Sequence, residues 1–293
     1  MAYTLPSDVD ARPVAVIGGG TLGRRIAAMF AAGGTDVHVF DLSADQRAAA
    51  VDFATRQAPG IRQKLDITAP RTGTVEAAAD LAQAVDRAWL VIEAVPEKRD
   101  LKIEVFGTLD RLAAADAILA SNSSSFATSE LIDKVEHVER VLNTHYQMPP
   151  DLNAVELMSD GHTDENIILA LMAKLPQYGL VPFHVRRQSD GFILNRVWAA
   201  IKRECLMVVA EGVATPEDVD HMWQLFVAAG IPPFRLMDRV GLDVVLDIEE
   251  HYAAARAGIP KGPRTLLREY IAQGRLGVKT GRGFYDESQA KES

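Results

Sequence analysis

The chain has 293 residues, of which 48% are hydrophobic and 24% charged, and its formal net charge at pH 7 is −9. This composition is typical of a globular protein, and the length predicts about two domains. The negative charge argues against nucleic acid as a partner, because binding to phosphate backbones depends on Lys and Arg. The single cysteine, Cys205, excludes an internal disulfide and a cysteine-rich zinc site, and we expect no metal.

The N-terminus lacks the features of a targeting segment. Its first 13 residues carry Asp8, Asp10 and Arg12 and have no apolar core, which is not typical of a signal peptide. No window reaches about 18 uncharged apolar residues, the length that a membrane helix needs. We therefore expect a cytoplasmic protein with no membrane partner.

Short apolar runs alternate with helical segments as far as residue 187. Strands are predicted over 14–17, 37–40, 89–92, 117–120, 141–145, 154–158 and 181–185. Helices are predicted over 21–32, 43–56, 75–84, 101–114 and 166–178. This alternation predicts βαβ units and a parallel, doubly wound sheet.

The strand pattern is absent after residue 187, and helices are predicted over 192–213, 216–227 and 242–255. The sequence therefore predicts an α/β N-terminal domain, residues 1–187, followed by an all-helical C-terminal domain, residues 188–293. The first helix of the second domain is apolar nearly all round, which favours burial deep in the domain or between two subunits. We expect a homodimer.

The turn after the first predicted strand contains Gly18, Gly20 and Gly23 in the pattern G-x-G-x-x-G. The pattern follows a strand and opens a helix, as a Rossmann-type dinucleotide site requires. Gly18 permits a tight turn, Gly20 lets the backbone approach a pyrophosphate, and Gly23 lets helix and strand pack closely. Thr21 and Leu22 begin the helix, whose free N–H groups would bind the phosphates.

Asp41 lies at the end of the second predicted strand, 18 residues after Gly23. A carboxylate at this place can accept hydrogen bonds from the ribose 2′-hydroxyl of a dinucleotide, and it would repel a 2′-phosphate. We therefore expect NAD rather than NADP as the cofactor. The alternative is a structural glycine turn beside a solvated aspartate.

Further motifs occur in a fixed order along residues 14–285. They are VAVIGGGTLG (14–23), IEAVPEKRDLK (92–102), ILASNSSS (118–125), GFILNR (191–196), EGVATPEDVD (211–220), GLD (241–243) and KTGRGFY (279–285). With these motifs the chain resembles the L-3-hydroxyacyl-CoA dehydrogenase family. The resemblance implies an NAD-dependent oxidoreductase that interconverts a 3-hydroxyacyl and a 3-ketoacyl compound.

The resemblance also implies the residues of a catalytic site. His145 matches the family's catalytic histidine, which takes the proton of the 3-hydroxyl group, a task suited to a side chain that titrates near neutral pH. Glu156 matches the glutamate that orients this histidine and stabilises its charged form. Ser124 and Asn195 match residues that hydrogen-bond the substrate oxygens. The alternative role for Ser124 is to cap the next helix, and for Asn195 it is to cap or bridge helices.

Other matching positions line the cofactor in the family. They are Ala94, Glu97, Lys102 and Asn122 near the ribose and nicotinamide, and Lys279 near the C-terminus. For the two lysines the alternative is a solvated surface cation, and for Glu97 it is an exposed charge at a strand end.

The chain departs from the family around the catalytic histidine. The family usually reads H-F-F-N-P, whereas residues 145–149 read H-Y-Q-M-P, so Met148 replaces an asparagine. Gln147 offers an amide from a neighbouring position. The histidine and Glu156 are 11 residues apart, one fewer than is usual, and Asp151 is an alternative orienting acid.

A second departure concerns the segment 42–75, which is shorter than usual. In the family this segment holds the CoA moiety with a lysine-rich helical tail; here it offers Arg56, Arg62, Lys64 and Arg71. Fewer cations should bind the CoA phosphates less well. The expected substrate is a 3-hydroxyacyl compound, as a CoA thioester. The alternatives are a non-CoA 3-hydroxy acid, such as a sugar or carnitine-like acid, and a non-catalytic dinucleotide-binding structural protein.

Overall fold

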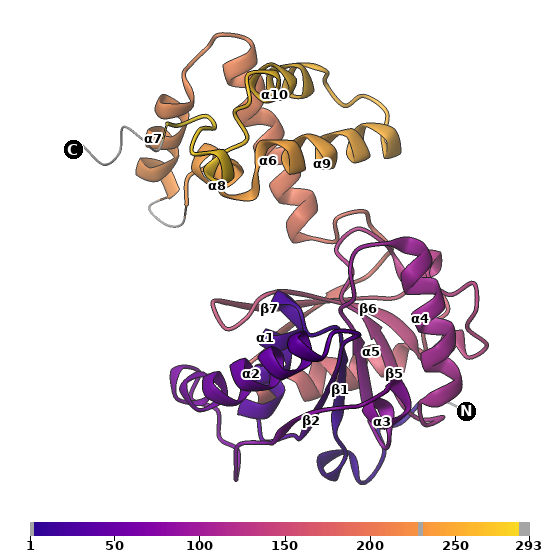
Figure 1. Ribbon diagram of the computed structural model, residues 1–293. Coiled ribbons are helices and arrows are strands. Elements are labelled where there is room, and N and C mark those ends of the chain that lie inside the picture. The colour runs from indigo at the N-terminus through magenta and orange to yellow at the C-terminus, as the bar shows by residue number, and fades with distance from the viewer. Residues whose placement is uncertain (1–2, 228–230, 287–293) are drawn as a thin grey trace. The chain divides into compact units, whose positions relative to one another are not determined.

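The computed structural model describes residues 3–227 and 231–286. The chain divides into two compact units, Met1–Ile193 and Leu194–Ser293, so the division falls a few residues after the expected boundary at 187 (Figure 1). None of the helices in the described part of the chain has the length and apolar character that crossing a membrane requires.

The first unit is built on a sheet of eight strands in the order β3-β2-β1-β4-β5-β6-β7-β8. The strands are β1 (Val14–Ile17), β2 (Val37–Phe40), β3 (Val75–Ala77), β4 (Leu90–Glu93), β5 (Ile118–Ser121), β6 (Val141–Met148), β7 (Leu152–Met158) and β8 (Val181–Val185). The helices of the unit are α1 (Thr21–Ala32), α2 (Ala44–Lys64), α3 (Leu81–Val85), α4 (Arg99–Leu112) and α5 (Glu165–Lys174). Short 3-10 turns occupy Val9–Ala11, Thr128–Glu130, Val138–Arg140 and Leu175–Tyr178.

The predicted parallel, doubly wound sheet is confirmed for β1 to β6. It is wrong for the last two strands, because β7 runs antiparallel to β6, and β8 runs parallel to β7. The connection between β6 and β7 is the turn 149–151. So short a link can join antiparallel strands only, since a parallel pair needs a crossover of a dozen or more residues.

Two predicted helices differ most from the structure. The segment 75–84, predicted as a helix, forms β3, whose Val75 pairs with Val37 of β2, and then α3. The side chain of Asp80 accepts the N–H of Gln83 and so caps α3, which delays the start of the helix. Helix α2 continues beyond residue 56 to Lys64, because it buries an apolar stripe that ends at Ile61.

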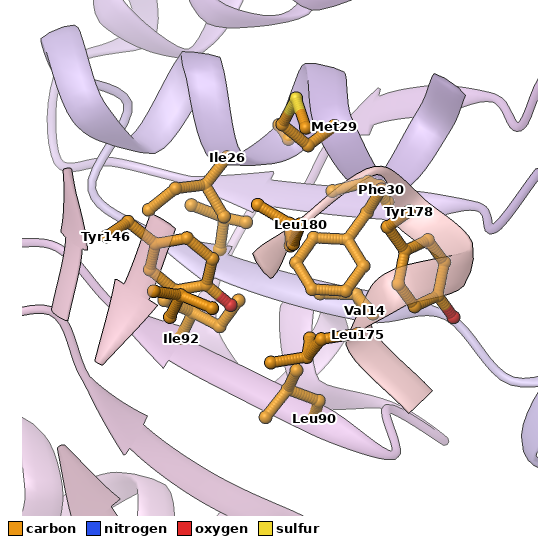
Figure 2. Packing of buried hydrophobic residues seen from close by; sticks show 14 of the residues in the cluster. Val14, Ile26, Met29, Phe30, Leu90, Ile92, Tyr146, Leu175, Tyr178 and Leu180 are labelled. Atoms are coloured by element: carbon orange, nitrogen blue, oxygen red, sulfur yellow. The ribbon is translucent and has the colours of Figure 1, made fainter. Parts of the chain in front are cut away.

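The alternation of side chains along the strands divides the core between the two faces of the sheet. On one face Val14, Val16 and Ile92 pack against α1, α2 and α5, in the cluster whose aromatic members include Phe30 and Tyr146 (Figure 2). On the other face the core residues are those of the intervening positions, packed against α3 and α4. Because the period is two residues, His145 lies on this second face.

Apart from isolated bridges at Gly277, Arg282 and Asp286, the regular secondary structure in the described residues of the second unit is helical, as predicted. Its helices are α6 (Leu194–Ala210), α7 (Pro216–Val227), α8 (Pro233–Val240), α9 (Leu242–Ala255) and α10 (Gly262–Ala272), with a 3-10 turn at Val278–Thr280. Its core is formed by Leu206, Phe234, Met237, Leu242, Val245, Leu267 and Phe284. Helix α6 buries one face into this core and exposes Leu194 and Val197.

Candidate active site

The glycine turn connects β1 to α1 and leaves the start of the helix open. Gly18 has a φ of 111°, and a Cβ atom there would lie 2.4 Å from the carbonyl oxygen of Ala94. A Cβ atom on Gly23 would lie 1.8 Å from the carbonyl oxygen of Gly18, whereas one on Gly20 would meet no atom of residues 3–227 and 231–286 within 4 Å. Gly20 is the N-cap of α1 and supplies no side chain to the first turn. The N–H groups that begin at Thr21 are therefore accessible to a phosphate.

Asp41 stands beside this turn at the end of β2. Its carboxylate accepts the backbone N–H of Gly19 at 2.9 Å through one oxygen and that of Ser43 at 3.0 Å through the other. A carboxylate has about four acceptor sites, so these bonds leave capacity for ribose hydroxyls. Asp41 is half-buried and fixed to the turn, in contrast to the solvated aspartate of the alternative reading.

His145 of β6 and Glu156 of β7 face each other directly in the antiparallel register. The Nδ1 atom of His145 lies 2.8 Å from Oε2 of Glu156, and both residues are buried, 5% and 3% exposed. The histidine ring stacks on Phe192 with centroids 4.7 Å apart. The backbone N–H of Ile193 donates to Glu156 Oε1 at 2.8 Å. Because Nδ1 faces the carboxylate, Nε2 is the nitrogen left for proton transfer.

The shortened hairpin keeps this pair together. The register is irregular between Tyr146 and Met148, but His145 still pairs with Glu156 across the strands. The alternative acid, Asp151, lies at the turn and forms ion pairs with Lys64 at 3.2 Å and Arg25 at 3.7 Å. Glu156, not Asp151, is therefore the carboxylate that orients the histidine in this structure.

A buried group of charged side chains lies at the neighbouring carboxyl ends of β4 and β5. Glu93 ends β4 with 0% exposure, and the ammonium of Lys102, which is 1% exposed, lies 2.7 Å from its carboxylate. Ser121 donates its hydroxyl to the other oxygen of Glu93 at 2.8 Å. Burial raises the pKa of Glu93 above its ordinary value, against the lowering effect of Lys102 and Ser121. Lys102 is thus not the solvated cation of the alternative reading.

Glu97 extends this group toward the loop that follows β5. Its carboxylate lies 3.1 Å from Lys102 Nζ and accepts the Ser123 hydroxyl and, at 3.0 Å, the N–H of Ser125. Burial would raise the pKa of Glu97, but Lys102 and these hydrogen bonds outweigh it and hold the pKa below its ordinary value. On the same loop Asn122 accepts the N–H of Tyr146 at 2.9 Å, which ties the loop to the strand of His145.

The comparisons with known proteins agree with this arrangement. The sequence model of the 3-hydroxyacyl-CoA dehydrogenase NAD-binding domain matches residues 13–188, and that of the C-terminal domain of the same family matches residues 191–287. The chain belongs to the 3-hydroxyacyl-CoA dehydrogenase family. It is an NAD-dependent oxidoreductase of that type.

Relatives of this dehydrogenase differ in their substrates. A probable 3-hydroxybutyryl-CoA dehydrogenase of Bacillus subtilis is 32% identical over 282 residues, which cover 95% of this chain and 98% of that protein. A 5-formyl-3-hydroxy-2-methylpyridine 4-carboxylate 5-dehydrogenase of Mesorhizobium japonicum is 31% identical, covering 94% and 90%. Among solved structures, (S)-3-hydroxybutyryl-CoA dehydrogenase from Ralstonia eutropha superimposes with a TM-score of 0.82 at 29% identity, covering 94% and 98%.

Most residues predicted for the dehydrogenase site lie at one edge of the sheet. The glycine turn, Asp41, Ala94, Glu97 and Asn122 follow the carboxyl ends of parallel strands, and Ala94 donates its N–H to the carbonyl of Ile17 at 2.7 Å. Ligands of open α/β sheets bind at this edge, where the strand order reverses between β1 and β4. Together with the open helix start, these residues fit NAD.

The remaining predicted residues have other surroundings. Ser124 is exposed on the loop after β5. Asn195 and Lys279 belong to the second unit, where Asn195 lies in the first turn of α6 and Lys279 pairs with Asp243 at 2.6 Å. Their roles toward substrate and cofactor stay predictions.

Sequence reasoning missed Glu93, Ser121 and Ser123, which hold Lys102, Glu97 and the loop in place. The available signal was an acidic residue that ends an apolar run, with three serines after the next strand.

Proposed function

We propose that the enzyme oxidises a secondary alcohol at the 3-position of its substrate, and reduces the ketone in reverse, with His145 as general base and acid. NAD, when bound, supplies the hydride acceptor. The observation that carries this proposal is the bond between His145 Nδ1 and Glu156, which directs Nε2 toward proton transfer. Glu156 then stabilises the imidazolium that forms when the 3-hydroxyl proton reaches Nε2. A non-catalytic role would place no demand on this pair.

For the substrate we propose a 3-hydroxyacyl-CoA thioester, as in the relative from Bacillus subtilis. Ser124 and Asn195 would hydrogen-bond its oxygens. The charge that develops on the 3-oxygen during hydride transfer needs such donors, because a polar contact that strengthens in the transition state lowers the barrier.

A non-CoA hydroxy acid is the second candidate, and the segment 42–75 favours it. Four of the five cations of that segment, those named above, have a partner within the chain: Arg56 with Asp52, Arg62 with the carbonyl of Ala69, Lys64 with Asp151, and Arg71 with Asp36. Exposed pairs of this kind contribute about 0–1 kcal/mol each, so phosphates could still displace them. The pairs weaken the case for CoA without removing it.

The two candidates are separated by following NADH oxidation with acetoacetyl-CoA and, in parallel, with free acetoacetate. Turnover of the thioester alone supports the CoA substrate. Turnover of the free acid alone supports the second candidate. If neither is turned over, the acyl-CoA proposal is overturned, and the second candidate is then tested with other hydroxy acids outside CoA chemistry.

We also propose that the enzyme is a homodimer, through the second unit. Helix α7 exposes Met222, Leu225 and Phe226, the last with 87% exposure, and such a patch is rare on a monomer surface. A second copy can cover it by an isologous contact, in which the same patch serves both subunits. Light scattering should give twice the chain mass, and Phe226→Asp should give the monomer mass. A monomeric wild-type protein would contradict the proposal.

A further inference from the structure

We propose that Gln147 is a positioning residue that weakens the basicity of the His145–Glu156 pair by bonding the carboxylate oxygen that His145 uses. The inference rests on the proposed role of His145 as the base. Gln147 is two residues from His145 on β6, so both side chains lie on the same face of the sheet.

The geometry places two donors on one oxygen. The amide Nε2 of Gln147 donates to Glu156 Oε2 at 3.0 Å, and His145 Nδ1 is 2.8 Å from the same oxygen. The amide nitrogen and Nδ1 are 3.2 Å apart. Because the amide nitrogen bonds a carboxylate and Nδ1 carries a hydrogen toward it, these two nitrogens both present N–H groups and their contact is not a hydrogen bond. The other carboxylate oxygen already accepts the N–H of Ile193.

This arrangement disfavours the charged imidazolium in two ways. A carboxylate that is shared with an amide donor and a backbone N–H attracts the Nδ1–H group less strongly than one that serves the histidine alone. The positive end of the amide dipole also lies close to Nδ1, and in a buried site such a dipole acts with little screening. Removing the Gln147 amide should therefore favour the charged imidazolium.

Other titratable groups lie on the neighbouring elements of the first unit. They are Tyr146 on β6, Asp151 at the turn, His184 on β8, Arg186, Arg187 and Asp190 after β8, and the Glu93, Glu97 and Lys102 group beyond β5. Tyr146 points into the core on the opposite face, and His184 pairs in register with Leu157 of that same core. Asp151 and Lys102 have the partners described above. Gln147 shares the Glu156 oxygen that His145 Nδ1 faces.

The test compares Gln147→Met, which keeps the side-chain length but removes the donor, with the full-length wild-type enzyme. Histidine NMR titration, with His145 assigned from its absence in His145→Ala, should show the His145 pKa raised by about 0.5–1 unit in the variant. The pH profile of kcat/KM should follow. On the acid side, alcohol oxidation should fall by about 3–10-fold, and on the alkaline side, ketone reduction should rise by a similar factor.

Two further variants distinguish the expected effect on the His145 pKa from a structural effect of the substitution. Gln273→Met makes the same change at an exposed position at the end of α10 and should leave both profiles unchanged. Gln147→Glu sets a second carboxylate against Glu156 and should raise the His145 pKa further than Gln147→Met does, and it provides the comparison should Gln147→Met fail to fold.

An unchanged or lowered His145 pKa in Gln147→Met, or in Gln147→Glu if that variant alone is folded, overturns the inference. So does a loss of both reaction directions at every pH with no shift of the profile. Failure of the proposed function looks different: His145→Ala would then retain its kcat, while the NMR titration would still report the effect of Gln147.

Discussion

Removing the Lys102 side chain should destabilise the first unit far more than removing a surface lysine. In Lys102→Met the buried carboxylate of Glu93 loses its ammonium partner at 2.7 Å, and its remaining partners in the described part of the chain are neutral donors, the Ser121 hydroxyl and the N–H of Val95. Breaking a buried pair in this way costs about 3–5 kcal/mol. The matched control is Lys134→Met, which breaks an ion pair to Glu104 with both side chains more than half exposed and should cost under about 1 kcal/mol.

The measurement is urea unfolding followed by the fluorescence of Trp89, which is fully buried beside β4. Trp198 and Trp223 should be replaced by phenylalanine in every protein compared, so that the signal reports the first unit. The loss of stability in Lys102→Met should depend on pH. Burial raises the folded-state pKa of Glu93, and without Lys102 that pKa rises further, so stability is retained below the unfolded-state pKa and lost as the pH rises toward the folded one.

The free energies of unfolding of Lys102→Met and the wild type should therefore differ less at about pH 5 than at about pH 8. In the double variant Glu93→Leu/Lys102→Met no charge is left unpaired in this pair, and part of the stability should return. Equal costs for Lys102→Met and Lys134→Met, or a cost that does not change with pH, would refute the reasoning.

Three other predictions concern the reaction and the cofactor. His145→Ala should lower kcat by about 10²–10⁴-fold with NAD affinity nearly unchanged, and Glu156→Gln should lower kcat less. Steady-state kinetics and NAD titration measure both effects. An intact kcat in His145→Ala would remove His145 from the mechanism. Asp41→Ala should weaken NAD binding and reduce the discrimination against NADP, and unchanged Kd values for both would remove Asp41 from the ribose site. Gly20→Ala should fold, because its Cβ atom has open space among the described residues, yet it should bind NAD less well. Gly23→Ala should also lower the Tm, because its Cβ would overlap the Gly18 carbonyl. Equal losses of Tm in the two variants would contradict this.

The parts of the fold that follow from local chemistry could be predicted from the sequence. The glycine turn was placed correctly because a tight turn between a strand and a helix leaves few alternatives to glycine at positions 18 and 23. The strand at Val75 was missed because the alanine-rich residues after it favour a helix, and its pairing with Val37 depends on a segment distant in the sequence.

The candidate site also contains features that could be predicted from the sequence and features that could not. The resemblance named His145 and Glu156, and the structure bonds them, yet the spacing alone gave no means of choosing between Glu156 and Asp151. That choice is made by strand register, a tertiary property. The ion pair of Glu93 with Lys102 was not predictable from composition, because a lysine nine residues after a strand is usually exposed, and only the packing of α4 on the sheet buries it.

The antiparallel pairing of β6 with β7 also determines where residues can be inserted or deleted near the catalytic pair. His145 and Glu156 are held opposite each other by ladder hydrogen bonds, while the turn 149–151 merely closes the hairpin. Residues gained or lost at the turn leave the pair in place, whereas a single deletion within either strand would send one of the two side chains to the opposite face. Genetic insertions and deletions should therefore be tolerated at the tip of this hairpin and excluded a few residues away on both sides.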